Sequence, residues 1–125
     1  MKFKPLSLKV IVADLKKLPY VEAIILFGSH ARGTTRQDSD IDIAVITKGA
    51  TEEQEYALRG GDDLFDIHPF KQLPLIIQFR VFNEGKILYI RNKNSLHEIK
   101  AEVLRKYLAA EPFLEKVALR VLANV

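Results

Sequence analysis

The sequence contains no cysteine, and this absence excludes two kinds of stabilising structure. Neither a disulfide framework nor a cysteine-based structural zinc site can form, which suits a reducing compartment, so we expect a cytoplasmic protein. Long apolar runs are absent as well, because Lys9 and Asp14 interrupt the apolar residues near the N-terminus. A membrane-spanning helix needs ~20 consecutive apolar residues, so we expect no association with a membrane.

Charge of one sign is not concentrated in any part of the sequence. The formal net charge is only +3, and the lysines and arginines are scattered along the chain. A mildly basic protein suits anionic nucleotides, but direct binding to nucleic acid is not expected without a basic cluster.

The length and composition fit one globular domain. Hydrophobic residues make up 48% of the 125 residues, and no segment is a repeat or is low in complexity. A chain of this length can build one core but not two. We therefore expect a single domain over residues 1–125, with its core in residues 1–91 and helices in residues 94–123.

An apolar run that stops at a glycine marks the first candidate functional element. Residues 21–27 (VEAIILF) are typical of a buried strand that runs into a tight turn. Gly28 tolerates a positive φ and has no side chain to keep a ligand away from the backbone. Ser29 can cap a short helix and leave free N–H groups beside its hydroxyl. This combination outlines a phosphate-binding turn.

Two aspartates open the next apolar run, residues 40–46 (DIDIAVI). Alternate residues of a strand share a face, so Asp40 and Asp42 should point the same way, with Cα atoms roughly 6.5 Å apart. Their carboxylates repel each other unless a cation lies between them. Two carboxylates together with substrate phosphates are the usual way in which proteins hold Mg²⁺.

Two better-known phosphate and metal motifs fail in this stretch. Gly28 and Gly33 have the glycine spacing of a P-loop, but Thr34 stands where that motif requires a lysine. The aspartates also mimic the start of an EF-hand loop, yet Ile43 occupies the position of its obligatory glycine.

The remaining pattern is Gly28-Ser29, ten intervening residues and then Asp40-x-Asp42. It resembles the signature of the minimal nucleotidyltransferases of the DNA polymerase β superfamily, in which a third aspartate lies on a later strand. The flanking residues match as well. The resemblance implies an α/β fold of the polymerase β-like nucleotidyltransferase type, with a mixed sheet, flanking helices and further helices at the C-terminus.

The third aspartate of the family signature is best placed at Asp66, in the apolar run 64–68 (LFDIH). Asp62 and Asp63 compete for this role, although their position beside two glycines favours solvated turn residues. If the strand of Asp66 lies beside the strand of Asp42, its carboxylate can join the same cluster.

The family resemblance implies a Mg²⁺-dependent transfer of a nucleoside monophosphate, with ATP as the expected donor, to an acceptor hydroxyl. Three carboxylates would be catalytic and would hold two Mg²⁺ ions: Asp40, Asp42 and Asp66. Three further residues would bind the nucleotide: Gly28, Ser29 and Arg32.

Other polar side chains near the motif are open to more than one interpretation. Arg32 and Arg36 could contact phosphates or brace the acidic strand, and Arg36 is as readily a surface residue. His30 and His68 have no second histidine at ligand spacing. We therefore interpret both histidines as polar residues near the cleft and not as zinc ligands.

The motif does not identify the acceptor molecule, and the resemblance implies two kinds of acceptor. Minimal nucleotidyltransferases paired with HEPN-domain toxins act as antitoxins and adenylylate the toxin. Antibiotic nucleotidyltransferases usually carry a larger acceptor domain, for which this chain lacks room. We therefore expect a HEPN-domain toxin as the protein partner. The alternative is a non-catalytic partner-binding module, which an Asp66 pointing away from the cleft would favour.

Helical periodicity and turn residues predict the remaining elements. We expect helices over residues 8–18, 51–58 and 73–84, strands over residues 64–70 and 86–91, and a loop over residues 60–63. Thr51 should cap the second helix. The helix over residues 73–84 is apolar almost all round and should be largely buried.

Two helices are predicted near the C-terminus. Ser95 and Glu98 form a capping box for the first, and Pro112 should begin the second. Their apolar faces exceed the needs of so small a core. These helices either pack on the domain itself or bind a partner, which would give a homo- or hetero-oligomer.

Overall fold

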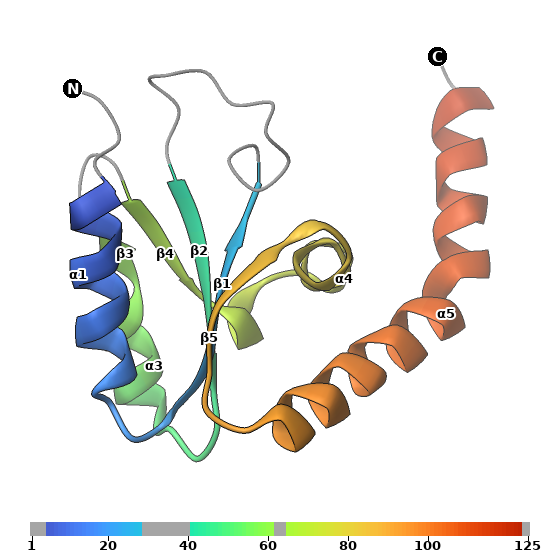
Figure 1. The fold of residues 1–125 in the computed structure, drawn as a ribbon. Helices are drawn as coiled ribbons and strands as arrows, with labels where there is room; N and C mark the ends of the chain where they lie inside the picture. Colours follow the sequence, from blue (N-terminus) through green and yellow to red (C-terminus); the bar gives the residue numbers. More distant parts are fainter. Residues whose placement is uncertain (1–4, 29–40, 62–64, 124–125) are drawn as a thin grey trace.

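The computed structural model describes residues 5–28, 41–61 and 65–123. They form a five-stranded mixed sheet in the order β3-β4-β2-β1-β5, with helices on both faces (Figure 1). The strands are β1 (Val21–Phe27), β2 (Ile41–Thr47), β3 (Gly60–Gly61), β4 (Phe65–Pro69) and β5 (Lys86–Ile90). The helices are α1 (Pro5–Lys16), α3 (Glu52–Leu58), the 3₁₀ turn η1 (Phe70–Gln72), α4 (Leu75–Glu84) and α5 (Lys93–Ala123). The expected mixed-sheet α/β fold is confirmed.

β1 and β2 occupy the centre of the sheet because their sequences are apolar on both faces. Residues 21–25 of β1 are buried, and Asp42 is the one residue of β2 that is not. β2 pairs with β1 in antiparallel fashion and with β4 in parallel fashion. Because β2 and β4 are parallel, both strands begin at the same end of the sheet. The candidate site lies at this end.

Different helices cover the two faces of the sheet (Figure 1). On the face of α1 and α3 the buried core includes Leu15, Ile24, Ile43, Leu58 and Phe65. On the face of α4 and the N-terminal half of α5 it includes Ala44, Ile46, Val81, Leu96 and Val103. Because β2 contributes buried side chains to the core on both faces of the sheet, its backbone is fixed by packing where the site lies.

The predicted break between two C-terminal helices is wrong. A single helix, α5, carries Pro112 in its interior. A proline inside a helix removes one backbone hydrogen bond and crowds the preceding turn, so it bends a helix without having to end it. The axis of α5 changes direction along its length, and the C-terminal half extends away from the sheet (Figure 1). In the described ranges, no helix combines the length and apolar character needed to cross a membrane.

The predicted N-cap of this helix is also wrong. The side chain of Asn92, two residues outside the expected range, accepts a hydrogen bond from the Ser95 N–H at 3.1 Å. Asparagine caps a helix as well as serine does, so the helix begins earlier, at Lys93. Ser95 is buried instead, and its hydroxyl accepts a hydrogen bond from Lys48 Nζ at 3.3 Å.

Three smaller expectations have different outcomes. Thr51 caps α3 as predicted, and Gln54 completes a capping box with it. Residues 60–61, predicted as a loop, pair with β4 as the two-residue strand β3. α4, predicted to be largely buried, buries only Val81 because the helix turns one side toward the sheet.

Candidate active site

The parallel pairing of β2 and β4 brings two aspartates together at one edge of the sheet. Asp42 is the second residue of β2, Asp66 is the second residue of β4, and the register places them opposite each other. Side chains of in-register neighbours leave the sheet on the same side, so the two carboxylates converge. Asp66 therefore lies beside the aspartate strand, where the sequence predicts it. The competing Asp62 and Asp63 fall outside the described residues.

His68 joins the two carboxylates into one group. Its Nε2 lies 3.3 Å from Asp42 Oδ1 and 3.3 Å from Asp66 Oδ2. One ligand atom from each of the three residues lies within 4.8 Å of the others. The sequence interpretation put His68 near the cleft but missed this pairing. The Asp-x-His spacing signals it, because residues two apart on a strand share a face.

The neighbouring carboxylates raise the pKa of His68 above its ordinary value of 6.5. The hydrogen bond with Asp42 is the largest cause, partial burial of the ring opposes it, and the negative charges of Asp66 and Asp42 add to the increase. The Phe27 ring contacts the imidazole edge-on at 5.5 Å between centroids. A protonated His68 thus offsets the repulsion between the two aspartates.

Gly28 is required at the end of β1 for two separate reasons. Its φ is +78°, a conformation that residues with a side chain rarely adopt. A Cβ at this position would also lie 2.6 Å from Asp42 Oδ2. The lack of a side chain at Gly28 therefore leaves space for the Asp42 carboxylate, so the conformation of the turn and the position of this carboxylate depend on each other.

Several further candidate residues lie outside the described residues, among them Ser29, His30, Arg32, Arg36 and Asp40. The helix cap predicted at Ser29 and the shared face predicted for Asp40 and Asp42 belong to this group. These assignments stay predictions.

The donor atoms of the acidic group fit a hard divalent cation. Mg²⁺ binds through one or two carboxylates and keeps its remaining positions for water and substrate phosphates. The side chains of Asp42 and Asp66 are 31% and 52% exposed, so a cation can reach both. Two acids held side by side are also destabilised without a positive charge between them. Asp42 and Asp66 could therefore hold Mg²⁺, with the His68 imidazole next to both carboxylates.

An open cleft of about 460 Å³ lies where the end of α3 meets β4. Its walls combine β4 with the end of α3: Tyr56, Arg59, Asp66, Ile67 and His68.

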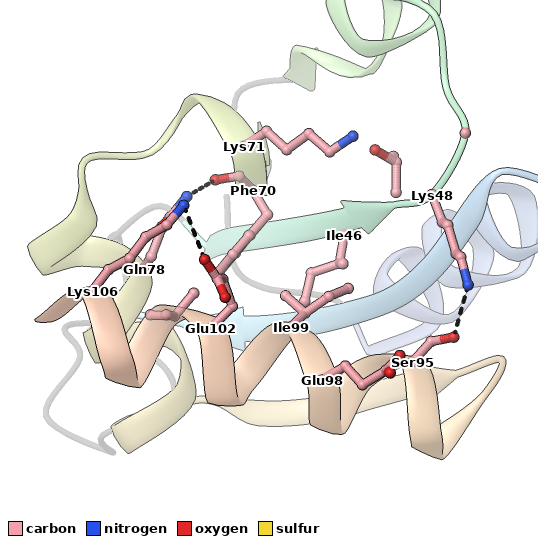
Figure 2. Close-up of a pocket in the computed structure, with 13 residues that line it drawn as sticks. Ile46, Lys48, Phe70, Lys71, Gln78, Ser95, Glu98, Ile99, Glu102 and Lys106 are labelled. Carbon is pink, nitrogen blue, oxygen red and sulfur yellow. Dashed lines mark hydrogen bonds and ion pairs between the residues drawn. The ribbon is translucent and has the colours of Figure 1, made fainter.

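A second cavity, of about 420 Å³, lies at the other end of β2 beside η1 and α5 (Figure 2). Lys48 points toward α5, where it donates to Ser95, and Gln78 donates to the carbonyl of Phe70 at 3.0 Å (Figure 2). Both polar groups are therefore engaged in internal contacts. Among the described residues, the one group of acids and histidines close enough to hold a metal is at the opposite end of β2.

Comparison with known proteins gives a family and a set of related folds. The family model "Polymerase beta, Nucleotidyltransferase" matches residues 9–94, which include the turn at Gly28 and both described aspartates. The protein adenylyltransferase MntA of Shewanella oneidensis is 27% identical over 113 residues, which cover 82% of this chain and 79% of that protein.

Two solved structures share the fold. A toxin-antitoxin crystal structure with AMP-PNP matches with a TM-score of 0.72 and 22% identity, over 91% of this chain and 96% of that chain. A structure of the tri-AMPylated S. oneidensis HEPN toxin in complex with an MNT antitoxin matches with a TM-score of 0.66 and 20% identity, over 91% and 93%. The family match spans most of the chain and includes the residues that form the acidic group. This chain belongs to the polymerase β family of nucleotidyltransferases.

Proposed function

We propose that this protein is a Mg²⁺-dependent adenylyltransferase that transfers AMP from ATP to a hydroxyl group on a protein partner. The observation that carries the proposal is the in-register pair of Asp42 and Asp66. It lies beside a turn in which residue 28 has no room for a side chain. The similarity to a protein adenylyltransferase supports ATP as the donor and a protein as the acceptor.

Each part of the site has a role in this proposal. Asp42 and Asp66, together with Asp40, would hold two Mg²⁺ ions. Bound Mg²⁺ would offset the negative charge of the phosphates and make the acceptor hydroxyl a better nucleophile. The backbone at Gly28 would contact the triphosphate, and Ser29 and Arg32 are the further contacts expected from the sequence.

The reaction is a displacement at the α-phosphorus of ATP. The acceptor oxygen forms a bond to this phosphorus, and the bond between the phosphorus and the oxygen that bridges to the β-phosphate breaks. Pyrophosphate leaves with that bond's electron pair, and the hydroxyl proton passes to water. Because the entering and leaving oxygens must be aligned, the chain's main contribution is to position both substrates.

A HEPN-domain toxin is the partner that we propose, which would make this protein the antitoxin of a pair. Two of the similar structures are toxin-antitoxin complexes, and one of them contains an AMPylated HEPN toxin. The C-terminal half of α5 extends away from the sheet and exposes Phe113, Leu119 and Val121, which leaves apolar surface for such a partner.

The test is co-expression with the product of the neighbouring gene, followed by intact-mass analysis of the purified complex. The expected result is a stable complex in which the partner gains the mass of one or more AMP groups. This gain should disappear with Asp42→Asn and persist with Asp14→Asn, which changes an exposed aspartate on α1.

Two other outcomes would contradict the proposal in different ways. A partner that binds but never gains mass in the presence of ATP and Mg²⁺ would indicate the non-catalytic alternative, in which the protein acts by occlusion. A gain in mass that survives Asp42→Asn would place the activity outside the acidic group.

A further inference from the structure

We propose that His68 is a metal ligand, and that Asp42, Asp66 and His68 together hold one divalent transition-metal ion, such as Zn²⁺, before the nucleotide binds. The inference rests on the proposed function and deepens it, because it assigns the class of ion at one of the two metal positions. Mg²⁺ would then enter with the triphosphate. The family signature contributes only carboxylates, so the imidazole is an addition to it.

The three side chains leave the sheet on one face, the face that α4 and α5 cover. Asp42 is two residues before Ala44 on β2, and Ala44 belongs to the buried core on that face. Asp66 lies opposite Asp42, and His68 is two residues further along β4. Since alternate residues of a strand share a face, the backbone itself brings the two carboxylates and the imidazole together.

The distances within this group suit a shared ion. Nε2 of His68 lies 3.3 Å from Asp42 Oδ1 and 3.3 Å from Asp66 Oδ2. A charge-assisted N–H···O bond is shorter, about 2.7–2.9 Å, and a single hydrogen on Nε2 cannot point at both oxygens. Ligand atoms about 2.0–2.2 Å from one ion lie roughly 2.8–3.6 Å apart when adjacent in tetrahedral or octahedral geometry, so both distances fit. The two carboxylate oxygens lie within 4.8 Å of each other, a separation that rotation of one carboxylate can shorten.

The imidazole is held with Nε2 toward the carboxylates. Phe27 of β1, which belongs to the same face of the sheet, contacts it edge-on with the ring centroids 5.5 Å apart. The side chain of His68 is 30% exposed, whereas that of Asp66 is 52% exposed. An ion can therefore reach the group beside Asp66, and the contact with Phe27 restricts rotation of the imidazole.

The donor atoms decide which ion binds. Mg²⁺ prefers oxygen ligands and keeps several of its waters, whereas an imidazole nitrogen favours zinc and its neighbours in the first transition series. Because His68 has no second histidine at ligand spacing, the sequence predicts no zinc site, but two carboxylates supply the remaining ligands. Three protein ligands and one open position are typical of catalytic zinc. Such an ion binds without ATP, whereas Mg²⁺ depends more on the phosphates of the substrate.

The test is a titration of the full-length, tag-free protein with Zn²⁺ alone, followed by calorimetry and by ¹⁵N NMR of the imidazole. The wild type should bind Zn²⁺ more tightly than Mg²⁺ in the absence of nucleotide, and the Nε2 signal of His68 should move while Nδ1 stays protonated. His68→Gln should weaken Zn²⁺ binding at least about tenfold, the loss that even a changed outer-shell partner brings. Its affinity for Mg²⁺-ATP should change far less.

A conservative variant and a matched control separate ligation from general damage. His68→Asp keeps a third ligand but replaces nitrogen by oxygen, so the preference should move from Zn²⁺ toward Mg²⁺. His97→Gln removes an exposed histidine of α5 and should leave Zn²⁺ binding at the level of the wild type. Asp42→Asn should weaken the binding of both Zn²⁺ and Mg²⁺-ATP. Denaturant unfolding of each variant checks that it is folded.

Several results would overturn the proposal and leave the proposed function standing. Equal Zn²⁺ affinity in the wild type and in His68→Gln is one, and an equal loss of Zn²⁺ and Mg²⁺-ATP affinity in that variant, as a purely structural role gives, is another. The assignment is also refuted if Zn²⁺ leaves the Nε2 signal in place, or if His97→Gln lowers Zn²⁺ affinity as much as His68→Gln does. Failure of the function itself is distinct, because the wild type would then bind Zn²⁺ through His68 and still not bind Mg²⁺-ATP.

Discussion

Two carboxylate sites lie at opposite ends of β2, and they differ in how far water reaches them. At the N-terminal end, Asp42 and Asp66 are partly exposed and share one histidine. At the C-terminal end, Glu55 of α3 is 9% exposed, accepts a hydrogen bond from Thr47 and lies 4.0 Å from Lys71 Nζ. The other oxygen of Glu55 is buried without a partner among the described residues.

The difference separates acids that can do chemistry from an acid that holds structure. A cation and a nucleotide can reach only carboxylates that are open to water, and a pair of acids gains from a cation where a single acid gains less. Glu55 is enclosed and bound to the neighbouring strand, so it ties α3 to β2. Changes at the open end should therefore affect transfer, and changes at the closed end should affect stability.

The largest effect is expected at the pair of partly exposed acids, Asp42 and Asp66, called the open pair. Asp42→Asn and Asp66→Asn each keep the side-chain shape but remove an anionic ligand, so transfer should fall at least about a hundredfold, because catalytic metals contribute several kcal/mol. Asp42→Asn should also weaken Mg²⁺-dependent ATP binding, whereas Asp66→Asn should impair transfer more than binding. Calorimetry measures the ATP binding, and mass spectrometry measures the AMP transfer. Unchanged ATP binding in Asp42→Asn would refute the metal assignment, and full turnover in Asp66→Asn would pass its role to another acid.

The next effect concerns the turn that makes room for the open pair. Gly28→Ala forces a side chain into a φ of +78° and toward Asp42 Oδ2, so the free energy of unfolding should fall by about 1–3 kcal/mol and Mg²⁺-ATP binding should weaken. Gly49→Ala is the matched control, because its φ is +77° but a Cβ there meets nothing within 4 Å. It should destabilise the fold without affecting binding. Equal nucleotide affinity in the two variants would refute the role given to Gly28.

The closed end should show the reverse behaviour. Glu55→Ala leaves the Thr47 hydroxyl buried without its partner and should lower the free energy of unfolding by about 1–2 kcal/mol, with Mg²⁺-ATP affinity unchanged. Thr47→Val should act similarly, and the double variant should lose less than the sum because both changes break one interaction. Denaturant unfolding of the wild type, the two single variants and the double variant measures the coupling free energy between Glu55 and Thr47. Strict additivity would contradict the assigned tie between α3 and β2.

The sequence predicts the described part of the open end, which is Gly28, Asp42 and Asp66, because its signals are local. A glycine after an apolar run, alternate aspartates and a second apolar run with one acid specify the turn and the two strands, and parallel pairing then brings Asp42 and Asp66 together. The role of Glu55 was not predicted, because three acids begin α3 and composition does not say which is buried. Its spacing of three from the buried Leu58 is the signal that could have identified it.

The errors at the C-terminal helix have a similar physical origin. Asn92 and Ser95 are equally good caps, and only tertiary packing decides between them by burying Ser95 beneath Lys48. Pro112 lowers helix stability at one point, but neighbouring turns can carry the chain through it. Local preference alone does not settle either choice.

The smallest expected effect is the pH dependence of the open site, through His68. Its pKa is raised above 6.5, mainly by the hydrogen bond with Asp42. A group whose pKa is higher in the folded state stabilises the fold when it is protonated. This contribution should be complete below pH 6.5 and should disappear as the pH rises through the higher folded-state pKa.

An NMR titration of the His68 ring in the metal-free protein tests this sign, with His68→Gln to assign the signal. Asp42→Asn should lower the pKa of His68, because it removes the largest cause of the increase. Mg²⁺ should lower it too, since a cation on the same carboxylates competes with the imidazolium proton. At the closed end, Glu55→Ala should leave the titration unchanged. If Mg²⁺ shifts the pKa of His68 equally in the wild type and in Asp42→Asn, the ion does not bind at the open pair.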